Sequence, residues 1–407
     1  MIATLPGLTT GAFTAGRLMQ NAAMRKDRNG LARAIALLAS MGLSGCRSGG
    51  DLPPAKMATA PTRVDRPAQG SVVAAMTAAA DWQLAHPSEH KLWQWHQAPF
   101  WAGLHSFAPL SSDPSRYLNA IDAMGEANGW NHGPSRFHAD DQAITQSYFL
   151  LNESQPDPKR TAAALRLFDE MTTMPFDEPL DFDSKKTARE WVWCDALFMS
   201  PPALALAARA TGDLRYADLM SRLWWKTTAY LYDPVERLYF RDSRYFDLRE
   251  ANGAKVFWSR GNGWVLAGLA RVLEYLPAGY KDRARFESLF ADMASRVASL
   301  QSPDGYWRVS LLDPSSFPVP ETSGTGFFTY ALAWGVNTGR LDRTRFEPVT
   351  LRGWAALQRA LLPDGKLGYV QRVSAAPGAT GPEETEVYGV GAFLLAGTEV
   401  HRLVATR

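Results

Sequence analysis

Residues 389–396 read Gly-Val-Gly-Ala-Phe-Leu-Leu-Ala, a run of small and apolar side chains with no charged residue. A helix of this composition has no polar face, so it suits a position that is buried on all sides. Residues 203–208, Ala-Leu-Ala-Leu-Ala-Ala, have the same character. Between such runs lie segments with one charged face, as in residues 282–287, Asp-Arg-Ala-Arg-Phe-Glu. This alternation predicts inner helices that are covered by outer ones.

Apolar helical periodicity recurs in twelve segments, which alternate between the outer and the inner type. The expected outer helices are residues 71–84, 114–128, 158–173, 214–231, 281–300 and 342–361. The expected inner helices are residues 99–110, 140–152, 195–211, 262–276, 323–338 and 388–403. Six such pairs predict an all-α fold, an (α/α)6 barrel with an inner and an outer ring. An irregular bundle or an open solenoid with the same helices is the alternative.

Turn-like segments follow three of the expected outer helices, at residues 233–240, 303–307 and 363–369. Each combines Asp, Pro or Gly with aromatic residues, which predicts a turn that leads into a short extended strand.

The composition is that of an ordinary globular protein, with 407 residues, 46% apolar side chains and a formal charge of +2. This charge gives no general attraction to nucleic acid. Two cysteines, Cys46 and Cys194, are too few for a disulfide framework or a thiolate metal cluster. We expect a monomer or a weak homo-oligomer.

The first part of the chain resembles a bacterial lipoprotein signal. A basic segment, residues 24–28, precedes the mostly apolar residues 31–43, and Leu-Ser-Gly-Cys ends at Cys46. We therefore expect a signal peptide at residues 1–45, with Met24 as an alternative start, and a lipid on Cys46. Residues 46–70 then form a tether, and residues 71–407 form one catalytic domain. The expected location is the periplasm or the outer membrane of a bacterium, with membrane contact only through the lipid; an ordinary N-terminal extension is the alternative.

Polar residues stand directly before nearly every expected inner helix. Asp140, Asp141 and Asp195 precede two of these helices, Arg260 precedes a third, and Trp93 lies ahead of the first. If the inner helices run parallel, all of these side chains emerge at one end of the barrel and line a single mouth, where Asp141 and Trp93 are expected to bind substrate. Helix capping is the alternative for each of the acidic residues.

Residues 258–264, Trp-Ser-Arg-Gly-Asn-Gly-Trp, combine a cation with aromatic side chains at the start of an apolar helix. Arg260 can clamp a carboxylate, and Trp258 can offer a flat face to a sugar ring. Asn262 can cap the helix, while Trp264 begins its apolar face and is included among the expected substrate-binding residues. The alternative is a glycine-containing helix start with a surface arginine.

Asp195 is surrounded in sequence by Trp191, Trp193, Leu197 and Phe198. Apolar surroundings raise the pKa of a carboxyl group, so Asp195 can hold a proton near neutral pH and deliver it. Paired with an Asp from another inner helix, Asp140 or Asp141, it forms the two-carboxylate arrangement that is common in chemistry on sugars. A buried structural role is the alternative. The histidines have no metal-ligand spacing and no phosphate loop is present, so we expect neither metal nor cofactor.

Four motifs together resemble the unsaturated rhamnogalacturonyl hydrolases, glycoside hydrolase family 105, which are relatives of the family 88 unsaturated glucuronyl hydrolases. They are Ala-Asp-Asp-Gln-Ala-Ile from residue 139, Trp-Cys-Asp-Ala-Leu-Phe-Met-Ser-Pro-Pro from residue 193, Phe-Trp-Ser-Arg-Gly-Asn-Gly-Trp from residue 257, and residues 388–397. The resemblance runs from about residue 93 to the C-terminus.

This resemblance implies an (α/α)6 barrel that removes a 4,5-unsaturated uronic acid from the non-reducing end of lyase-generated oligosaccharides. In the family, a proton adds to C4 and water adds to C5, and the resulting hemiketal opens and releases the rest of the sugar chain. Asp195 matches the general acid/base of the family. Asp140 or Asp141 matches its second essential aspartate, with Asp140 favoured, and Trp258 and Arg260 match its substrate-binding residues. Where the family has a histidine, this chain has residues 238–243, so Arg241 is expected to contact the substrate carboxylate.

The expected partner is thus an oligosaccharide that ends in an unsaturated uronic acid. The missing histidine puts a rhamnogalacturonan substrate in doubt, because related enzymes act on unsaturated uronates from other polymers. A conventional inverting glycosidase with the same fold is a second hypothesis. A sugar-binding lipoprotein without catalytic activity is the third.

Overall fold

The structure, a computed structural model, describes residues 65–183 and 185–406. The expected signal peptide, the lipidated Cys46 and most of the tether lie outside the described residues. Within the described ranges, every helix falls short of the length and apolar character that crossing a bilayer requires.

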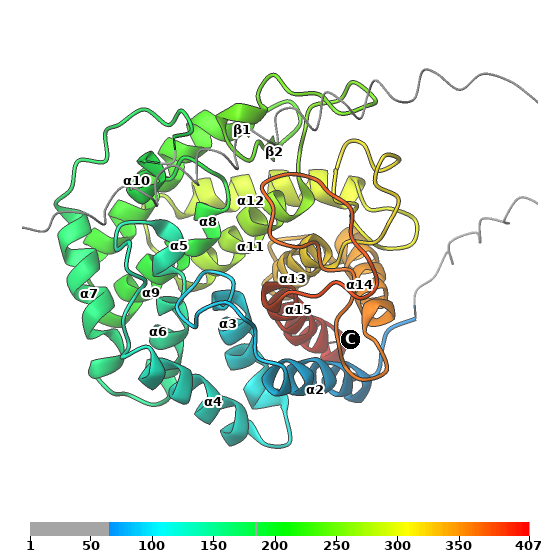
Figure 1. Cartoon of the computed structure of the whole chain (residues 1–407), viewed down its shortest axis with the longest axis horizontal. Helices are drawn as coiled ribbons and strands as arrows, with labels where there is room; N and C mark the ends of the chain where they lie inside the picture. The colour runs from blue at the N-terminus through cyan, green and yellow to red at the C-terminus, as the bar shows by residue number, and fades with distance from the viewer. Residues whose placement is uncertain (1–64, 184, 407) are drawn as a thin grey trace, which may run out of the picture. The chain divides into compact units, whose positions relative to one another are not determined.

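Six helices form the inner ring, and their side chains are almost entirely buried. They are α3 (Ala98–Phe107), α6 (Thr145–Ser154), α9 (Pro201–Thr211), α11 (Ser259–Tyr275), α13 (Thr322–Asn337) and α15 (Val387–Ala405). Each packs against the next, and α15 packs against α3, so the ring is closed (Figure 1). Closure excludes the open solenoid and confirms the predicted (α/α)6 barrel.

Six amphipathic helices cover this ring. They are α2 (Gln69–Ala85), α4 (Pro114–Ala127), α7 (Lys159–Thr172), α10 (Leu214–Leu231), α12 (Arg283–Ser299) and α14 (Arg343–Ala360). The carboxylates of Asp113, Asp213 and Asp342 cap three of them by accepting a backbone N–H two or three residues further on. Such caps fix where an exposed helix begins, because they pair one of the free N–H groups of its first turn.

Two of the predicted inner helices, at residues 140–152 and 195–211, are each broken in two, which leaves a separate short helix before the main one: α5 (Ala139–Gln142) before α6 and α8 (Ala196–Met199) before α9. The break after α8 follows from Pro201 and Pro202, which lack the N–H groups that would continue the helix. The side-chain amide of Gln146 on α6 donates instead to the carbonyl oxygens of Phe198 and Met199, at 2.9 and 3.0 Å. Asp140 lies in α5, and Asp195 lies directly before α8.

Short elements make up the rest of the described regular structure: three 3-10 turns, η1 (Ala108–Leu110), η2 (Lys186–Ala188) and η3 (Ser243–Tyr245), and two strands, β1 (Tyr232–Asp233) and β2 (Leu238–Tyr239). The strands pair antiparallel, with Tyr232 opposite Tyr239. This hairpin confirms the strand predicted at residues 233–240. The segment at 363–369 forms only a single bridge, between Leu361 and Leu367, and the one at 303–307 forms a turn without a strand.

Candidate active site

The side chain of Asp195 is 12% exposed, so it is nearly buried but still reachable from solvent. Its Oδ2 lies 3.6 Å from Nε of Arg241 and 3.5 Å from the thiol Sγ of Cys194. Burial raises the pKa of Asp195, while the positive charges of Arg241 and Arg260 oppose that rise. The apolar surroundings and the upward pKa shift that the sequence predicts are therefore both found.

The structure brings Asp140, and not Asp141, beside Asp195, because α5 packs against α8. The side chain of Asp140 is 21% exposed. Asp141 turns the other way, and its Oδ2 accepts the backbone N–H of Ser135 at 2.6 Å. Asp141 is thus largely buried and holds the loop before α5 in place, and its expected contact with substrate stays a prediction.

Asp140 and Asp195 act as one acid pair. Burial and then the charge of Asp195 raise the pKa of Asp140 to about 8, against an opposing effect of Arg241. A negative charge on Asp195 disfavours a second one on Asp140, so the pair holds a proton at neutral pH. Such a pair can donate a proton and receive it again, as general acid and base catalysis requires.

Arg241 follows the β1–β2 hairpin, which fixes its position. Its backbone carbonyl accepts the N–H of Cys194 at 2.8 Å, and this bond ties the hairpin to the segment that carries Asp195. The guanidinium donates to Asp242 at 2.6 Å, and the side chain of Arg241 is 17% exposed. A cation at this place, beside the acid pair and partly open to solvent, fits the expected contact with a substrate carboxylate.

His138 is a member of this site that the sequence reasoning missed. Its Nδ1 accepts the backbone N–H of Asp140 at 3.2 Å and so caps α5, and its ring packs against Trp193 with centroids 5.0 Å apart. Burial lowers the pKa of His138 to about 4, so the ring is neutral at neutral pH. Because Nδ1 is an acceptor, the proton must be on Nε2. The position of His138 in the sequence could have indicated this role, because it is the capping position directly before Asp140 and Asp141.

Arg260 is not a free clamp. Its side chain has no exposed surface, and its guanidinium donates to the carbonyl oxygens of Gln371, at 2.5 Å, and Arg372, at 2.9 Å. The guanidinium is also sandwiched between the rings of Trp258 and Tyr388, at 4.4 and 4.8 Å from their centroids. Arg260 therefore ties the start of α11 to the 371–372 segment and is not a surface arginine. Its charge acts on Asp195, and its expected contact with a substrate carboxylate stays a prediction.

Trp258 and Trp264 are likewise buried, and their expected contact with a sugar stays a prediction. Trp258 is 2% exposed and donates from Nε1 to the side-chain carbonyl of Gln371 at 2.8 Å. Trp264 has no exposed surface and packs against Phe327 with centroids 4.2 Å apart.

Asn262 does not cap α11, because the helix begins three residues earlier, at Ser259. Its side chain instead accepts the N–H of Tyr239 at 2.8 Å and donates to the carbonyl of the same residue at 3.0 Å. This pair of bonds fastens β2 to the inner ring two residues before Arg241. The amide thus contributes to the site indirectly.

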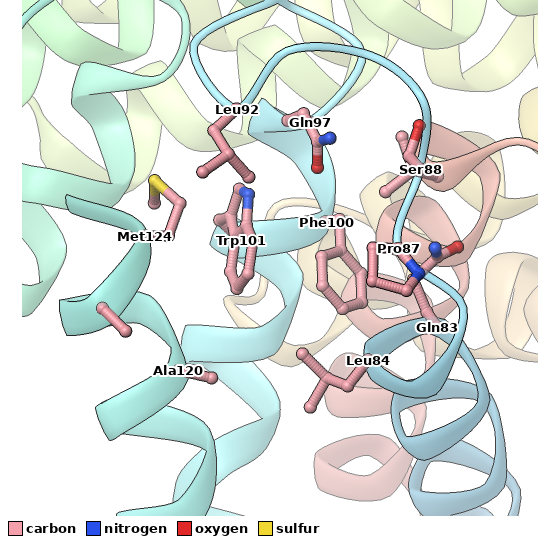
Figure 2. Close-up of a pocket in the computed structure, with 12 residues that line it drawn as sticks. Gln83, Leu84, Pro87, Ser88, Leu92, Gln97, Phe100, Trp101, Ala120 and Met124 are labelled. Atoms are coloured by element: carbon pink, nitrogen blue, oxygen red, sulfur yellow. The ribbon is translucent and has the colours of Figure 1, made fainter. Parts of the chain in front are cut away.

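Trp93 is half-buried and lies close to Asp141, since both side chains press on the backbone of Gly133. Its predicted contact with substrate stays a prediction. A separate pocket of about 360 Å³ lies between α2, α3 and α4 (Figure 2). Its lining includes Leu84, Phe100 and Met124 but no charged residue, so this pocket cannot supply the acid pair.

Comparison with known proteins places the chain among carbohydrate-active enzymes. The profile of Glycosyl Hydrolase Family 88 matches residues 70–404. A relative from Formosa agariphila, named "Unsaturated 3S-rhamnoglycuronyl hydrolase", is 39% identical over 343 residues, which are 82% of this chain and 91% of the relative. A solved structure named "Glycosyl hydrolase family 88 from Bacteroides vulgatus" is 30% identical, with a TM-score of 0.74, and covers 83% of this chain and 100% of that one. Another, named "Polysaccharide Lyase", is 34% identical, with a TM-score of 0.76 and coverage of 83% and 99%.

A closed helical barrel with paired carboxyl groups at one end, matched by this profile, defines a glycoside hydrolase. The chain belongs to Glycosyl Hydrolase Family 88. The resemblance stated from four sequence motifs is thereby confirmed. Among the described residues, no group of three or more His, Cys, Asp and Glu is arranged to hold a metal ion.

Proposed function

We propose that this hydrolase removes a 4,5-unsaturated uronic acid from the non-reducing end of oligosaccharides that polysaccharide lyases generate. The observation that carries the proposal is the acid pair, Asp140 and Asp195, which holds a proton at neutral pH beside the cation of Arg241. The name of the Formosa agariphila relative supports the same reaction and indicates rhamnose as the neighbouring sugar.

The reaction is a hydration of the C4=C5 double bond. Asp195 gives a proton to C4, the positive charge that develops at C5 is stabilised by the ring oxygen, and a water molecule adds at C5 after losing its proton to the carboxylate. The hemiketal then opens, and the rest of the sugar chain leaves from C1. Asp140 lies near Asp195, and burial together with the charge of Asp195 raises the pKa of Asp140 to about 8, so Asp140 adds no second negative charge at neutral pH. Arg241 holds the carboxylate on C5, which fixes the double bond over the acid.

One experiment distinguishes the proposed reaction from three other functions. The purified protein is offered an unsaturated disaccharide, its saturated counterpart and the parent polymer, and the ultraviolet absorbance of the double bond is followed. We expect absorbance to fall with the unsaturated disaccharide alone. A conventional inverting glycosidase, whose carboxylates are about 6.5 to 9.5 Å apart, would cleave the saturated disaccharide as well. A lyase would raise the absorbance with the polymer, and a binding protein would change none.

We also propose that the chain is anchored through a lipid on Cys46 in the bacterial periplasm or outer membrane. The basic and apolar residues before Leu-Ser-Gly-Cys support this anchor. Growth with a labelled fatty acid should label the full-length chain. The Cys46→Ser variant should lose the label and appear in the soluble fraction, and a labelled variant would rule the anchor out.

A further inference from the structure

Arg271 is a buried cation in the core of the barrel, near the C-terminal end of α11. Its side chain is 1% exposed, and its Nη2 has no hydrogen-bond partner among the described residues. The ring centroids of Phe198 and Tyr275 lie 5.8 and 5.3 Å from its central guanidinium carbon. A buried cation costs free energy, and an apolar side chain would fill this place at a lower cost. The hydrogen bond that Arg271 does make therefore indicates its role.

This hydrogen bond fixes the orientation of a buried amide. Arg271 donates from Nε to Oε1 of Gln146 at 3.0 Å. Because a guanidinium has donors only, the amide oxygen of Gln146 faces Arg271 and the amide nitrogen points away from it. That nitrogen donates to the carbonyl oxygens of Phe198 and Met199, at 2.9 and 3.0 Å. A flipped amide would have the same shape but would turn its oxygen toward these two carbonyl oxygens. Arg271 thus selects the orientation in which Gln146 can hold α8.

The end of α8 that Gln146 holds is close to the proposed acid. α8 has four residues, and Asp195 directly precedes it. A helix this short has little stability of its own, so its neighbours determine its position. Asp195 and Met199 are about one helical turn apart, and a displacement of the carbonyl groups therefore moves the carboxyl group as well.

A second buried glutamine joins α5 to the same place. Ser200, directly after α8, donates from Oγ to Oε1 of Gln142, which is the last residue of α5. The amide nitrogen of Gln142 donates to the carbonyl oxygen of Arg136 at 2.9 Å. Neither Gln142 nor Ser200 has exposed surface. Since α5 carries Asp140 and α8 follows Asp195, the two amides together set the separation of the two carboxyl groups.

We infer that Arg271 is a positioning residue for the acid pair, because it orients Gln146, which holds the end of α8 and thereby places Asp195 beside Asp140. The inference rests on the proposed function, in which this pair protonates the sugar. Arg271 makes no direct contact with either carboxyl group in this chain of bonds. Its effect on the reaction therefore passes through the position of α8.

The position of α8 can be measured through the titration of the pair. The charges of Asp195, Arg241 and Asp141 act on Asp140, and those of Arg241 and Arg260 act on Asp195. If α8 moves away from α5, the charge of Asp195 raises the pKa of Asp140 less, and water reaches the pair more easily. Both changes lower the pKa of Asp140 from its native value of about 8. Loss of a positive charge at Arg271 would by itself act in the opposite direction.

The test follows kcat, KM, the pH profile of kcat/KM and the unfolding temperature in Arg271→Met, Gln146→Met and the double variant. We expect Arg271→Met to lower kcat about tenfold, to change KM less than about twofold and to move the alkaline limb about half a pH unit lower. Its unfolding temperature should stay within about 3 °C, because a buried charge is lost together with its hydrogen bond. The double variant should lose no more kcat than Gln146→Met does.

Two further variants separate positioning from a general effect on stability. Arg271→Lys keeps the charge and a donor, and it should retain more turnover than Arg271→Met. Arg283→Met is the matched control. Arg283 also donates to backbone carbonyl oxygens, those of Leu273 and Leu276, at 2.9 and 2.8 Å, but it lies on α12. This control should lose stability while kcat and the alkaline limb remain native.

An alkaline limb that stays in place or moves to higher pH in Arg271→Met would overturn the inference. Additive losses of kcat in the double variant would overturn it as well. If Arg271→Met does not fold, Gln146→Met decides in the same way, because it too must move the limb to lower pH. NMR titration of the carboxyl groups measures the pair without turnover. A titration that moves to lower pH in Arg271→Met, in a protein that hydrates no unsaturated disaccharide, would sink the proposed reaction and leave the positioning role standing.

Discussion

Asp195 and Asp140 are subject to two opposing influences. Burial raises the pKa of both carboxyl groups, and the charge of Arg241 lowers both. Arg241 thereby sets the pH at which the pair loses its proton. The charge that we propose to bind the uronate therefore also lowers the pKa of the acid that is proposed to protonate it.

We predict that Arg241→Gln shifts the alkaline limb of the kcat/KM profile to higher pH. Without the guanidinium, the acid pair keeps its proton to a higher pH than about 8, where Asp140 titrates in the native protein. Turnover should also fall, since the substrate carboxylate loses its partner. The pH profile is measured beside Arg249→Gln, which should match the native limb because Arg249 is exposed and bonds to the carbonyl oxygens of Phe246 and Leu248. An alkaline limb that stays in place, or moves to lower pH, would contradict the role given to Arg241.

His138 offers a second test at this scale, because its capping and donor functions can be separated. Asparagine caps helices well, so His138→Asn should keep α5 folded while it removes the Nε2–H donor. If that donor bonds to a substrate hydroxyl, we expect KM to rise about fivefold with little change in unfolding temperature. The pH profile should stay as it is, since His138 is neutral above about pH 4. Native kinetics in His138→Asn would show that the residue is only a cap.

Among the elements, α8 determines where Asp195 lies. It is pressed against α11 at Gly268, where an added Cβ would lie 2.3 Å from the carbonyl oxygen of Leu197. On its other side, the side-chain amide of Gln146 donates to the carbonyl oxygens of Phe198 and Met199. A four-residue helix has little stability of its own, so these neighbours hold the acid in place.

We therefore predict that Gly268→Ala costs about 1 to 3 kcal/mol of unfolding free energy and lowers kcat, because α8 must shift with Asp195. Gly70→Ala is the control. Gly70 lies in α2 with nothing within 4 Å of the added carbon, so alanine should be neutral or stabilise slightly. Urea unfolding and steady-state kinetics measure both effects. Wild-type stability and turnover in Gly268→Ala would show that α8 has room to move.

Much of this element scale could be predicted from the sequence. All twelve helices follow from the apolar period, since inner and outer helices differ in composition along their whole length. The start of α11 was misplaced because Asn262 has the residue type of a cap, although its partners lie on β2. The burial of Arg260 could not be predicted either. Its carbonyl partners at residues 371 and 372 are more than a hundred positions away in the sequence, and no local sequence pattern indicates such a contact.

On the scale of the whole molecule, the site exists only when the ring is closed. Asp140, Asp195 and Arg241 come from α5, from the residue before α8 and from the segment after the hairpin. The inner helix α11 packs against both α8 and β2, and α5 packs against α8. The sequence predicted a common mouth from the strict alternation of helices. It could not predict which side chains face that mouth. The order of the helices indicates at which end of the barrel a residue lies, but not whether its side chain points into the mouth or into the core. Hence Asp140 and Asp195 meet there, whereas Arg260 and Trp264 lie in the core.

The central claim is that the acid pair protonates C4 of an unsaturated uronic acid. Turnover of an unsaturated disaccharide in deuterium oxide, followed from its first minutes by nuclear magnetic resonance, tests it most directly. A carboxyl group that is fixed in the site delivers its proton to one face of the double bond. We therefore predict one deuterium at C4 in a single configuration. The Asp195→Asn variant should form no product. Deuterium in both configurations, or release of the neighbouring sugar before any deuterium reaches C4, would contradict the account.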